Sequence, residues 1–227
     1  MVSVNIVVGG GRFGCKAVEY LIRRSESFIV IDEDRNCHVA QRFSLPRIGL
    51  DAVDSINPSK NYFMEGGTEV ALIVIEKLKP NRVFPTAPIH VAASLVKEKY
   101  SMEEWEEAVE SLTSRLPSSI IVSVGRATIV TSYNKNATCQ LACTAPDVCP
   151  VTGFRKPHPM YELLKMSAPK GVILRSYQLE PGLGALDGSE LLKAMEACGR
   201  SCKAIIGTAC ECHGVVTALK SPLSPPF

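Results

Sequence analysis

The stretch "VVGGGRFG", residues 7–14, decides the fold of this chain. It follows a β-branched run at residues 4–8 and opens an amphipathic segment, so it predicts a strand, a tight turn and a helix. Its glycines Gly9, Gly11 and Gly14 have G-x-G-x-x-G spacing. The first glycine makes the turn, the second lets the backbone approach a pyrophosphate, and the third lets helix and strand pack closely. Free N–H groups at the start of the helix would face the phosphates.

An acidic residue closes the second strand of this unit. The apolar run at residues 28–32 ends on Asp32, where a carboxylate can accept hydrogen bonds from both ribose hydroxyls of a dinucleotide. Its charge disfavours a 2′-phosphate, so NAD is expected rather than NADP. The glycine pattern leaves open two alternatives, a purely structural turn and an S-adenosylmethionine pocket.

Residues 4–21, "VNIVVGGGRFGCKAVEYL", followed by "FIVIDED" at 28–34, resemble the N-terminal Rossmann domain of TrkA/RCK-type potassium-transport regulators. The similarity extends over residues 3–55, and "GLDAVD" at 49–54 is similar to that family's glycine-aspartate-alanine segment. The resemblance implies a fold that holds NAD or a related nucleotide. The nucleotide contacts of the family would fall on Gly9, Gly11, Gly14 and Asp32, with Asp51 near the adenosine.

The rest of the chain predicts an α/β protein: a Rossmann-like, largely parallel sheet followed by a mixed α/β half. Short β-branched runs alternate with amphipathic stretches in the first half, as in strands joined by crossover helices. Further strands are expected at residues 47–50, 70–76 and 82–86. In the second half, strand-like runs bracket a cysteine-rich loop, and "GR" at 125–126 permits a hairpin.

A helix is predicted at residues 101–112, because Ser101 and Glu104 would form a capping box and apolar residues recur with a helical period. Beyond this segment, the alternation of strand-like runs and amphipathic stretches gives way to strand-like runs around the cysteines. We therefore expect a dinucleotide-binding domain at residues 1–117 and a cysteine-rich α/β extension at 118–227, with one continuous domain as the alternative.

The second half is rich in cysteine. Of nine cysteines, all but Cys15 and Cys37 fall within residues 139–212. "CQLACTAPDVCP" at 139–150 has two prolines that oppose a helix, and "TACECHG" follows a predicted strand end. Three thiolates from one loop and one from another segment would complete a [4Fe-4S] ligand set. The expected metal ligands are Cys139, Cys143, Cys149, Cys210 and Cys212.

Two other states of these cysteines stay open. Zinc also accepts four thiolates, or three with His213, although C-x2-C pairs are absent from this sequence. Unmetallated thiols would be catalytic or would simply pack in the core. Two histidines are weak catalytic candidates: His90, just beyond the strand expected at 82–86, and His213, beside Cys212.

Composition excludes several classes of protein. The net charge of +2 comes without a basic run, so nucleic acid is not an expected partner. The longest apolar runs are far too short to span a membrane, and the first residues lack the features of a secretory signal. A cytoplasmic location is therefore expected, where thiols stay reduced.

These observations predict a cytosolic redox protein in which NAD exchanges electrons with a cysteine-held metal centre, served by an electron-transfer partner. One alternative is a non-catalytic, homodimeric nucleotide sensor of the TrkA/RCK type, in which the cysteines hold a structural metal. The other is a metal-free enzyme that uses a thiol nucleophile.

Overall fold

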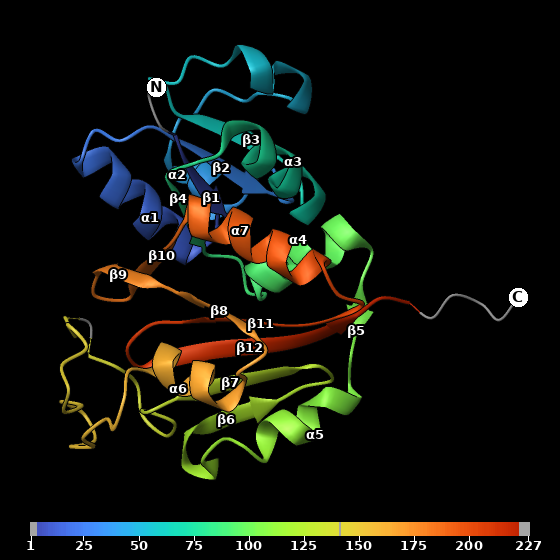
Figure 1. Ribbon diagram of the computed structural model, residues 1–227. Helices are drawn as coiled ribbons and strands as arrows, with labels where there is room; N and C mark the ends of the chain where they lie inside the picture. Colours follow the sequence, from blue (N-terminus) through green and yellow to red (C-terminus); the bar gives the residue numbers. More distant parts are fainter. Residues whose placement is uncertain (1–3, 141, 223–227) are drawn as a thin grey trace, which may run out of the picture.

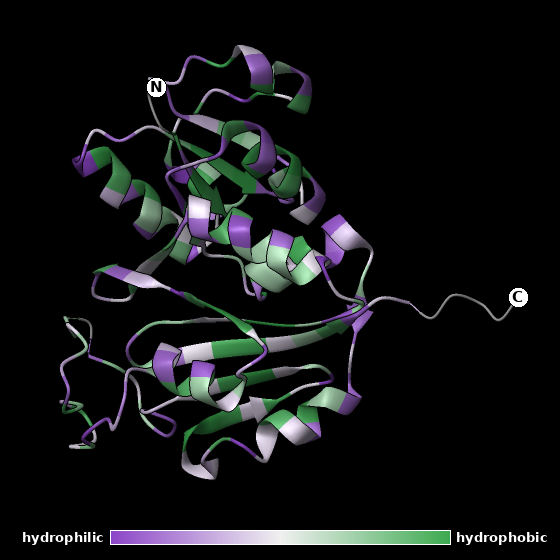
Figure 2. Ribbon diagram, viewed as in Figure 1, coloured by the Kyte–Doolittle hydropathy of each residue, from purple (hydrophilic) through white to green (hydrophobic). Residues whose placement is uncertain are grey.

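The computed structural model describes residues 4–140 and 142–222, which form two mixed sheets with helices packed against them (Figure 1). The expected α/β class is confirmed. Figure 2 shows that apolar residues are concentrated in the strands and on the helix faces turned toward them. Among these described residues, no helix has the length and apolar character needed to cross a membrane.

The apolar run before the glycine loop forms the centre of the first sheet. β1 (Asn5–Val8) pairs in parallel with β2 (Phe28–Asp32) and with β4 (Arg82–Pro85), and β2 pairs in parallel with β3 (Tyr62–Glu65). The resulting order β3-β2-β1-β4 matches the first four positions of the strand order 3-2-1-4-5-6 of doubly wound α/β folds.

Helices cover both faces of these strands. One face of α1 is buried, and Val18 and Leu21 pack with Phe28 and Phe84 of the sheet. α3 and α4 pack against each other in a second apolar cluster with Ile6 and Ile29. The helical segments of this half are α1 (Arg12–Arg23), α2 (His38–Arg42), η1 (Leu50–Ser55), α3 (Thr68–Leu78) and α4 (Val91–Tyr100).

Two of the strand predictions for this half are wrong. The run at 70–76 lies within α3, because a short apolar run suits a buried helix as well as a buried strand. The segment at 47–50 contributes only a bridge between Arg47 and Phe63, and the third strand is β3. The strand expected at 82–86 is confirmed as β4.

The prediction that a capping box at Ser101 begins a helix is also wrong. Ser101 has a left-handed backbone, with φ of 49°, and ends α4 instead of beginning a helix. β5 (Glu103–Glu104) then pairs with the end of β12 (His213–Lys220), and the helix begins only at α5 (Glu107–Thr113). Pairing with a distant strand thus overrides the local helical pattern at Glu104.

The second sheet has the order β6-β7-β12-β11-β8. The expected hairpin is present as antiparallel β6 and β7, and the β8–β11 pairing is parallel. α6 (Met160–Ser167) packs on this sheet through Met160 and Leu164. The strands are β6 (Ile121–Val124), β7 (Thr128–Ser132), β8 (Val172–Arg175), β11 (Lys203–Ala209) and β12 (His213–Lys220).

The chain returns to the first sheet late in its sequence. After β8, β9 (Tyr177–Glu180) and β10 (Leu183–Asp187) form a hairpin, and β10 pairs antiparallel with β4. α7 (Gly188–Gly199) follows, with Asp187 accepting a hydrogen bond from the N–H of Glu190. The two sheets therefore do not separate at residue 117, because residues 177–187 complete the sheet of the first half.

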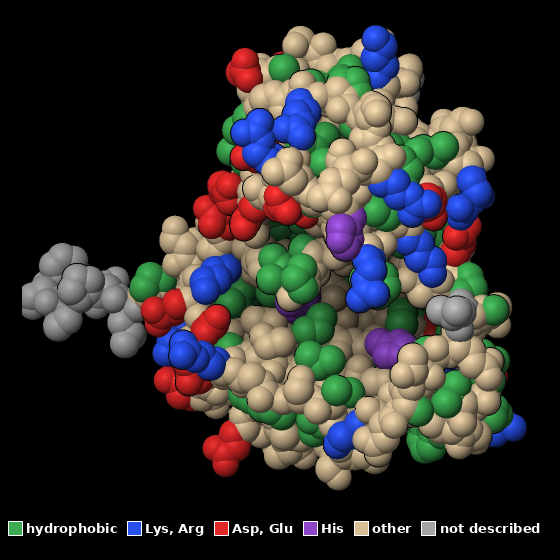
Figure 3. Space-filling model, turned by 180° about the vertical axis from the view of Figure 1, so that it is seen from behind, with side chains coloured by type: hydrophobic (Ala, Val, Ile, Leu, Met, Phe, Trp, Pro, Cys, Tyr) green, Lys and Arg blue, Asp and Glu red, His purple; other side chains and the backbone are tan. Residues whose placement is uncertain are grey.

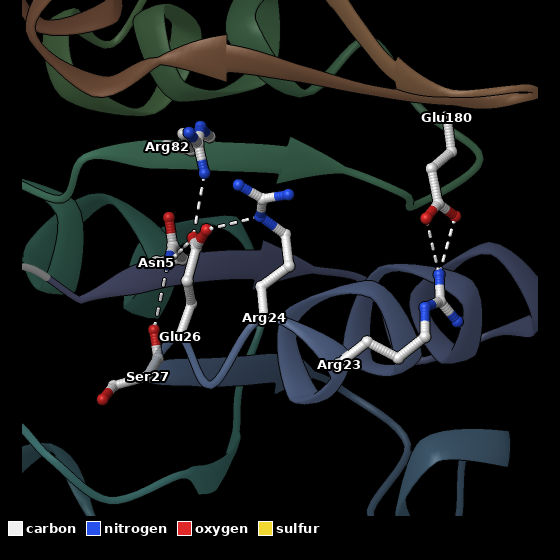
Figure 4. Close-up of polar contacts among 7 residues, drawn as sticks. All are labelled: Asn5, Arg23, Arg24, Glu26, Ser27, Arg82 and Glu180. Atoms are coloured by element: carbon white, nitrogen blue, oxygen red, sulfur yellow. Dashed lines mark hydrogen bonds and ion pairs between the residues drawn. The ribbon is translucent and has the colours of Figure 1, made fainter.

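Polar contacts hold the hairpin and the strand ends in place (Figure 4). Arg23 of α1 donates to both carboxylate oxygens of Glu180 in β9, at 2.7 and 2.8 Å. Glu26 accepts from Asn5, Arg24 and Arg82, which joins the loop after α1 to β1 and β4. Partial burial opposes ionisation, but these donors hold the pKa of Glu26 below its ordinary value of 4.5.

Replacing Glu26 with glutamine should destabilise the protein by about 1–2 kcal/mol at neutral pH, because three donors lose a charged acceptor. Since the folded pKa is depressed, this stabilisation is present above pH 4.5 and is lost as the pH falls through the folded value. Urea unfolding at several pH values measures the difference. Glu98→Gln, at an exposed position on α4, is the control and should change little. A loss that is independent of pH would contradict the assignment.

Candidate functional site

The three glycines of the loop have distinct structural surroundings. Gly9 has φ of +106°, and a Cβ there would lie 2.5 Å from the backbone nitrogen of Ala87. A Cβ on Gly14 would overlap the carbonyl oxygen of Gly9. A Cβ on Gly11 would meet nothing within 4 Å, so the backbone at the start of α1 is open to an approaching group. Gly9 thus permits the tight turn and Gly14 the close packing of helix and strand, while Gly11 leaves the start of α1 uncovered.

Asp32 lies at the glycine loop. Its carboxylate accepts hydrogen bonds from the N–H groups of Gly10 and Asp34, and the carbonyl of Gly10 accepts from Val39 at 2.9 Å. Asp32 therefore stabilises the loop itself, while a carboxylate has further lone pairs for a ligand. Asp51 lies exposed in η1, and no contact among the described residues joins it to the loop.

A cavity of about 490 Å³ lies between the start of α1, the β9–β10 hairpin, the loop at 139–151 and the turn between β11 and β12. We call it the cysteine cavity. Figure 1 draws α1, β9 and this loop on one side of the molecule. All the cysteines expected as ligands line the cavity, together with a histidine: Cys139, Cys143, Cys149, Cys210, Cys212 and His213.

His213 stands between two thiols. Its Nε2 lies 3.6 Å from the sulfur of Cys139, and its Nδ1 lies 3.8 Å from the sulfur of Cys210. The ammonium of Lys156 lies 3.4 Å from the sulfur of Cys212. Within residues 4–140 and 142–222, no three Cys, His, Asp or Glu side chains are close enough to share one metal ion. The sulfurs are gathered in one cavity without forming a closed ligand set.

The cysteine loop is attached to its surroundings by hydrogen bonds. Gln178 of β9 donates to the carbonyl of Cys143 at 2.8 Å, and Lys156 donates to the carbonyl of Ala145 at 2.9 Å. Cys149 donates its N–H to the carbonyl of Phe154, whose ring stacks on Tyr133. The β9–β10 hairpin and the segment after the loop therefore both position these thiols.

The surroundings change the acidity of these groups in different directions. Burial raises the pKa of Cys212, and the adjacent ammonium of Lys156 opposes that rise. A hydrogen bond from Thr152 lowers the pKa of Cys149. Desolvation lowers the pKa of His213, so its imidazole is neutral near pH 7 and offers a lone pair. The charge of Lys156 thus offsets only part of the desolvation, and the pKa of Cys212 stays above its ordinary value.

The other histidine candidate, His90, and two further cysteines of the second half lie elsewhere. His90 precedes α4, and its Nδ1 lies 2.8 Å from the hydroxyl of Thr217 in β12. Burial lowers its pKa to about 3, so the imidazole is neutral, and it does not line the cysteine cavity. Cys198 is buried in α7, which raises its pKa to about 11, and Cys202 is exposed.

A smaller cavity of about 270 Å³ lies at the carboxyl end of β4. It is lined by residues 85–88, and it shares Phe13 and residues 182–184 with the cysteine cavity. The ring of Phe13, on α1, therefore borders both spaces. On the face seen in Figure 3, a hollow separates the half with the first sheet from the half with the second.

Sequence reasoning missed several residues of this site. Phe13 occupies a variable position of the glycine pattern, and its large apolar side chain at a helix start was the only signal. Lys16 lines the cysteine cavity and donates to the carbonyl of Pro181. Lys156 reaches Cys212 across 56 positions of the chain, which local sequence does not reveal. Asn134 contacts Cys139 from only 5 positions away, but no motif marks it.

Residues 4–91 match the family model described as "Uncharacterized protein, N-terminal domain", and residues 92–221 match the one described as "Uncharacterized protein, C-terminal domain". A protein of Archaeoglobus fulgidus described as "Uncharacterized protein" is 42% identical over 217 residues, which cover 96% of this chain and 99% of that protein. No solved structure matches the chain.

The glycine geometry makes a prediction about stability. Gly14→Ala should destabilise the protein by about 2–3 kcal/mol, because the new methyl group overlaps a backbone carbonyl. Gly11→Ala should cost less than about 1 kcal/mol, since its methyl group meets open space. Denaturant unfolding of both variants measures the contrast. Equal losses would show that the loop is not packed as described.

Proposed function

This chain belongs to the family of uncharacterized proteins that those two domain models describe, and we propose that it is a cytoplasmic, NAD-binding redox protein with a thiolate-held metal centre. The observation that carries this proposal is the cysteine cavity, whose wall includes Phe13 and Lys16 of the glycine helix. A nucleotide bound at that helix would have thiols beside it.

Binding of the nucleotide is supported at the start of α1. Gly11 leaves the helix end uncovered, and it has no side-chain cap. The first N–H groups of a helix lack partners within the helix and favour an anion such as a pyrophosphate. From there the nicotinamide would extend toward the carboxyl end of β4, where the smaller cavity lies. That cavity continues to the thiols through its shared lining.

A metal centre is supported by the kind of donors in the cavity. Thiolates are the ligands of iron–sulfur clusters, and five cysteines exceed the four that a [4Fe-4S] cluster needs. The loop at 139–149 would have to close on the 210–212 turn to complete the set. Zinc is the alternative, favoured by the placement of His213 between Cys139 and Cys210.

The chemistry would be an exchange of electrons between the two sites. One NADH would become NAD⁺ and a proton, and its two electrons would pass one at a time through the cysteine-held centre to a partner that accepts both. Lys156 would stabilise the thiolate of Cys212 through its charge, and the apolar wall around Phe13 would limit access of water. An electron-transfer partner would complete the cycle.

Anaerobic purification followed by metal and sulfide analysis and a visible spectrum tests the centre. We expect iron and sulfide, with Cys139→Ser lowering the metal content at least about tenfold. Cys202→Ser is the matched control and should leave it unchanged, because Cys202 is exposed outside the cavity. Zinc without sulfide would favour the zinc alternative. An absence of metal would contradict the proposal of a metal centre.

Fluorescence titration with NADH tests the nucleotide site. Gly11→Ala should weaken binding at least about tenfold while the protein stays folded, because its methyl group occupies the space through which a pyrophosphate approaches. Gly125→Ala is the control, in a turn where a methyl group makes an ordinary contact at 3.7 Å. Unchanged affinity in Gly11→Ala would contradict the proposed site.

A further inference from the structure

We infer that a small hairpin at residues 147–156, here called the loop hairpin, is the docking surface for an acidic electron-carrier protein. The inference rests on the proposed function, because this partner would receive electrons from the cysteine cavity. The shape, the exposed side chains and the charge of the loop hairpin support the docking itself.

The loop hairpin has a defined backbone structure. Cys149 donates its N–H to the carbonyl of Phe154 at 2.8 Å, and the neighbouring pair Val148 and Arg155 forms an antiparallel bridge. The ring of Phe154 stacks on that of Tyr133, with ring centres 5.6 Å apart. A surface held in this way needs little ordering when a partner binds, so less of the binding energy is lost.

Apolar side chains are exposed on the loop hairpin. Val148, Val151 and Phe154 are 39%, 36% and 43% exposed. Arg155 lies opposite Val148 in the bridge, so a charged and an apolar side chain share one face. Figure 1 shows the segment between β7 and α6, coloured yellow, extending beyond the second sheet. Apolar groups with polar side chains around them are typical of a protein–protein interface.

The net positive charge of the chain is concentrated in the segment that carries the loop hairpin. Residues 133–159 contain three basic residues, Lys135, Arg155 and Lys156, and one acidic residue, Asp147. Taking these four from the totals of 25 basic and 23 acidic residues leaves 22 of each in the rest of the chain. Within the described part of the chain, neither Lys135 nor Arg155 forms an ion pair. Their charges are therefore available to acidic side chains of a partner.

The number of charges favours a protein over a nucleic acid or an anionic membrane. Nucleic-acid binding commonly uses about six to ten basic contacts with phosphates, and polybasic membrane segments carry about four to eight Lys or Arg residues. The segment has only three basic residues. Encounters between electron-transfer proteins use small, weak interfaces, which a few charges and exposed apolar side chains can supply.

The loop hairpin also reaches the proposed centre. Cys149 belongs to the hairpin and lines the cysteine cavity, and Val151, in its turn, lines the same cavity. The carbonyl that accepts the N–H of Cys149 belongs to Phe154, whose ring is partly exposed. A carrier docked on the hairpin would therefore lie close to the thiols, and a short separation is what electron transfer requires.

Calorimetric titration with a plant-type [2Fe-2S] ferredoxin, an acidic carrier, tests the docking without any nucleotide. We expect saturable binding that weakens about tenfold when the salt concentration rises from about 20 to about 200 mM. Cytochrome c, a basic carrier, should not bind. An absence of ferredoxin binding, an affinity independent of salt, or equal binding of cytochrome c would overturn the inference. Binding to anionic lipid vesicles but not to ferredoxin would overturn it in favour of a membrane surface.

Charge-reversal variants locate the docking surface. Arg155→Glu should weaken ferredoxin binding at least about fivefold, because an attraction becomes a repulsion. Lys60→Glu, at an exposed position before β3, is the matched control with the same change of charge and should alter the affinity less than about twofold. Equal losses in the two variants would place the docking elsewhere and overturn the assignment.

The same variant separates this inference from the proposed function. Arg155 does not line the cysteine cavity, so Arg155→Glu should keep the metal content and the NADH affinity of the unaltered protein. A protein that holds metal and NADH but does not bind ferredoxin would refute the docking alone. A protein without metal or NADH binding would refute the proposed function, whatever the ferredoxin titration shows.

Discussion

The antiparallel pairing of β10 with β4 is the constraint on which the site depends. Leu186 lies opposite Val83 and Asp187 opposite Arg82, so a segment from late in the chain completes the sheet that begins with the glycine loop. The hairpin that carries β10 becomes a wall shared by the two cavities, and Gln178 on its first strand holds the cysteine loop. Without this pairing, the glycine helix and the thiols would belong to separate halves of the molecule.

The glycine loop combines rigid packing with one open side. Gly9 and Gly14 admit no side chain, and Asp32 accepts a hydrogen bond from the loop backbone, so the start of α1 is fixed. Gly11 is the uncovered position at the end of that helix. A fixed backbone with unpartnered N–H groups is preorganised for an anionic ligand, because little ordering remains to oppose binding.

The sequence predicted the parts of this protein that local chemistry determines, namely the glycine loop, the second strand ending at Asp32, and the cysteines that share a cavity. It failed where tertiary contacts decide the outcome. Residues 70–76 form a helix because they are buried against α4 and η1, and Glu104 joins a strand because β12 lies beside it. Lys156 gave no local signal, since the sulfur that it contacts belongs to Cys212, 56 positions along the chain.

On the proposed function, the reactive end of a bound nucleotide would lie beside the thiols. It can be measured directly by loading the thiol site with Co²⁺ and recording the proton relaxation of bound NAD⁺, with Zn²⁺ as the diamagnetic reference. Relaxation by a paramagnetic ion falls steeply with distance, so the nicotinamide protons should relax faster than the adenine protons. Adenine protons that relax as fast or faster, or an absence of any cobalt effect on the nucleotide, would contradict the claim.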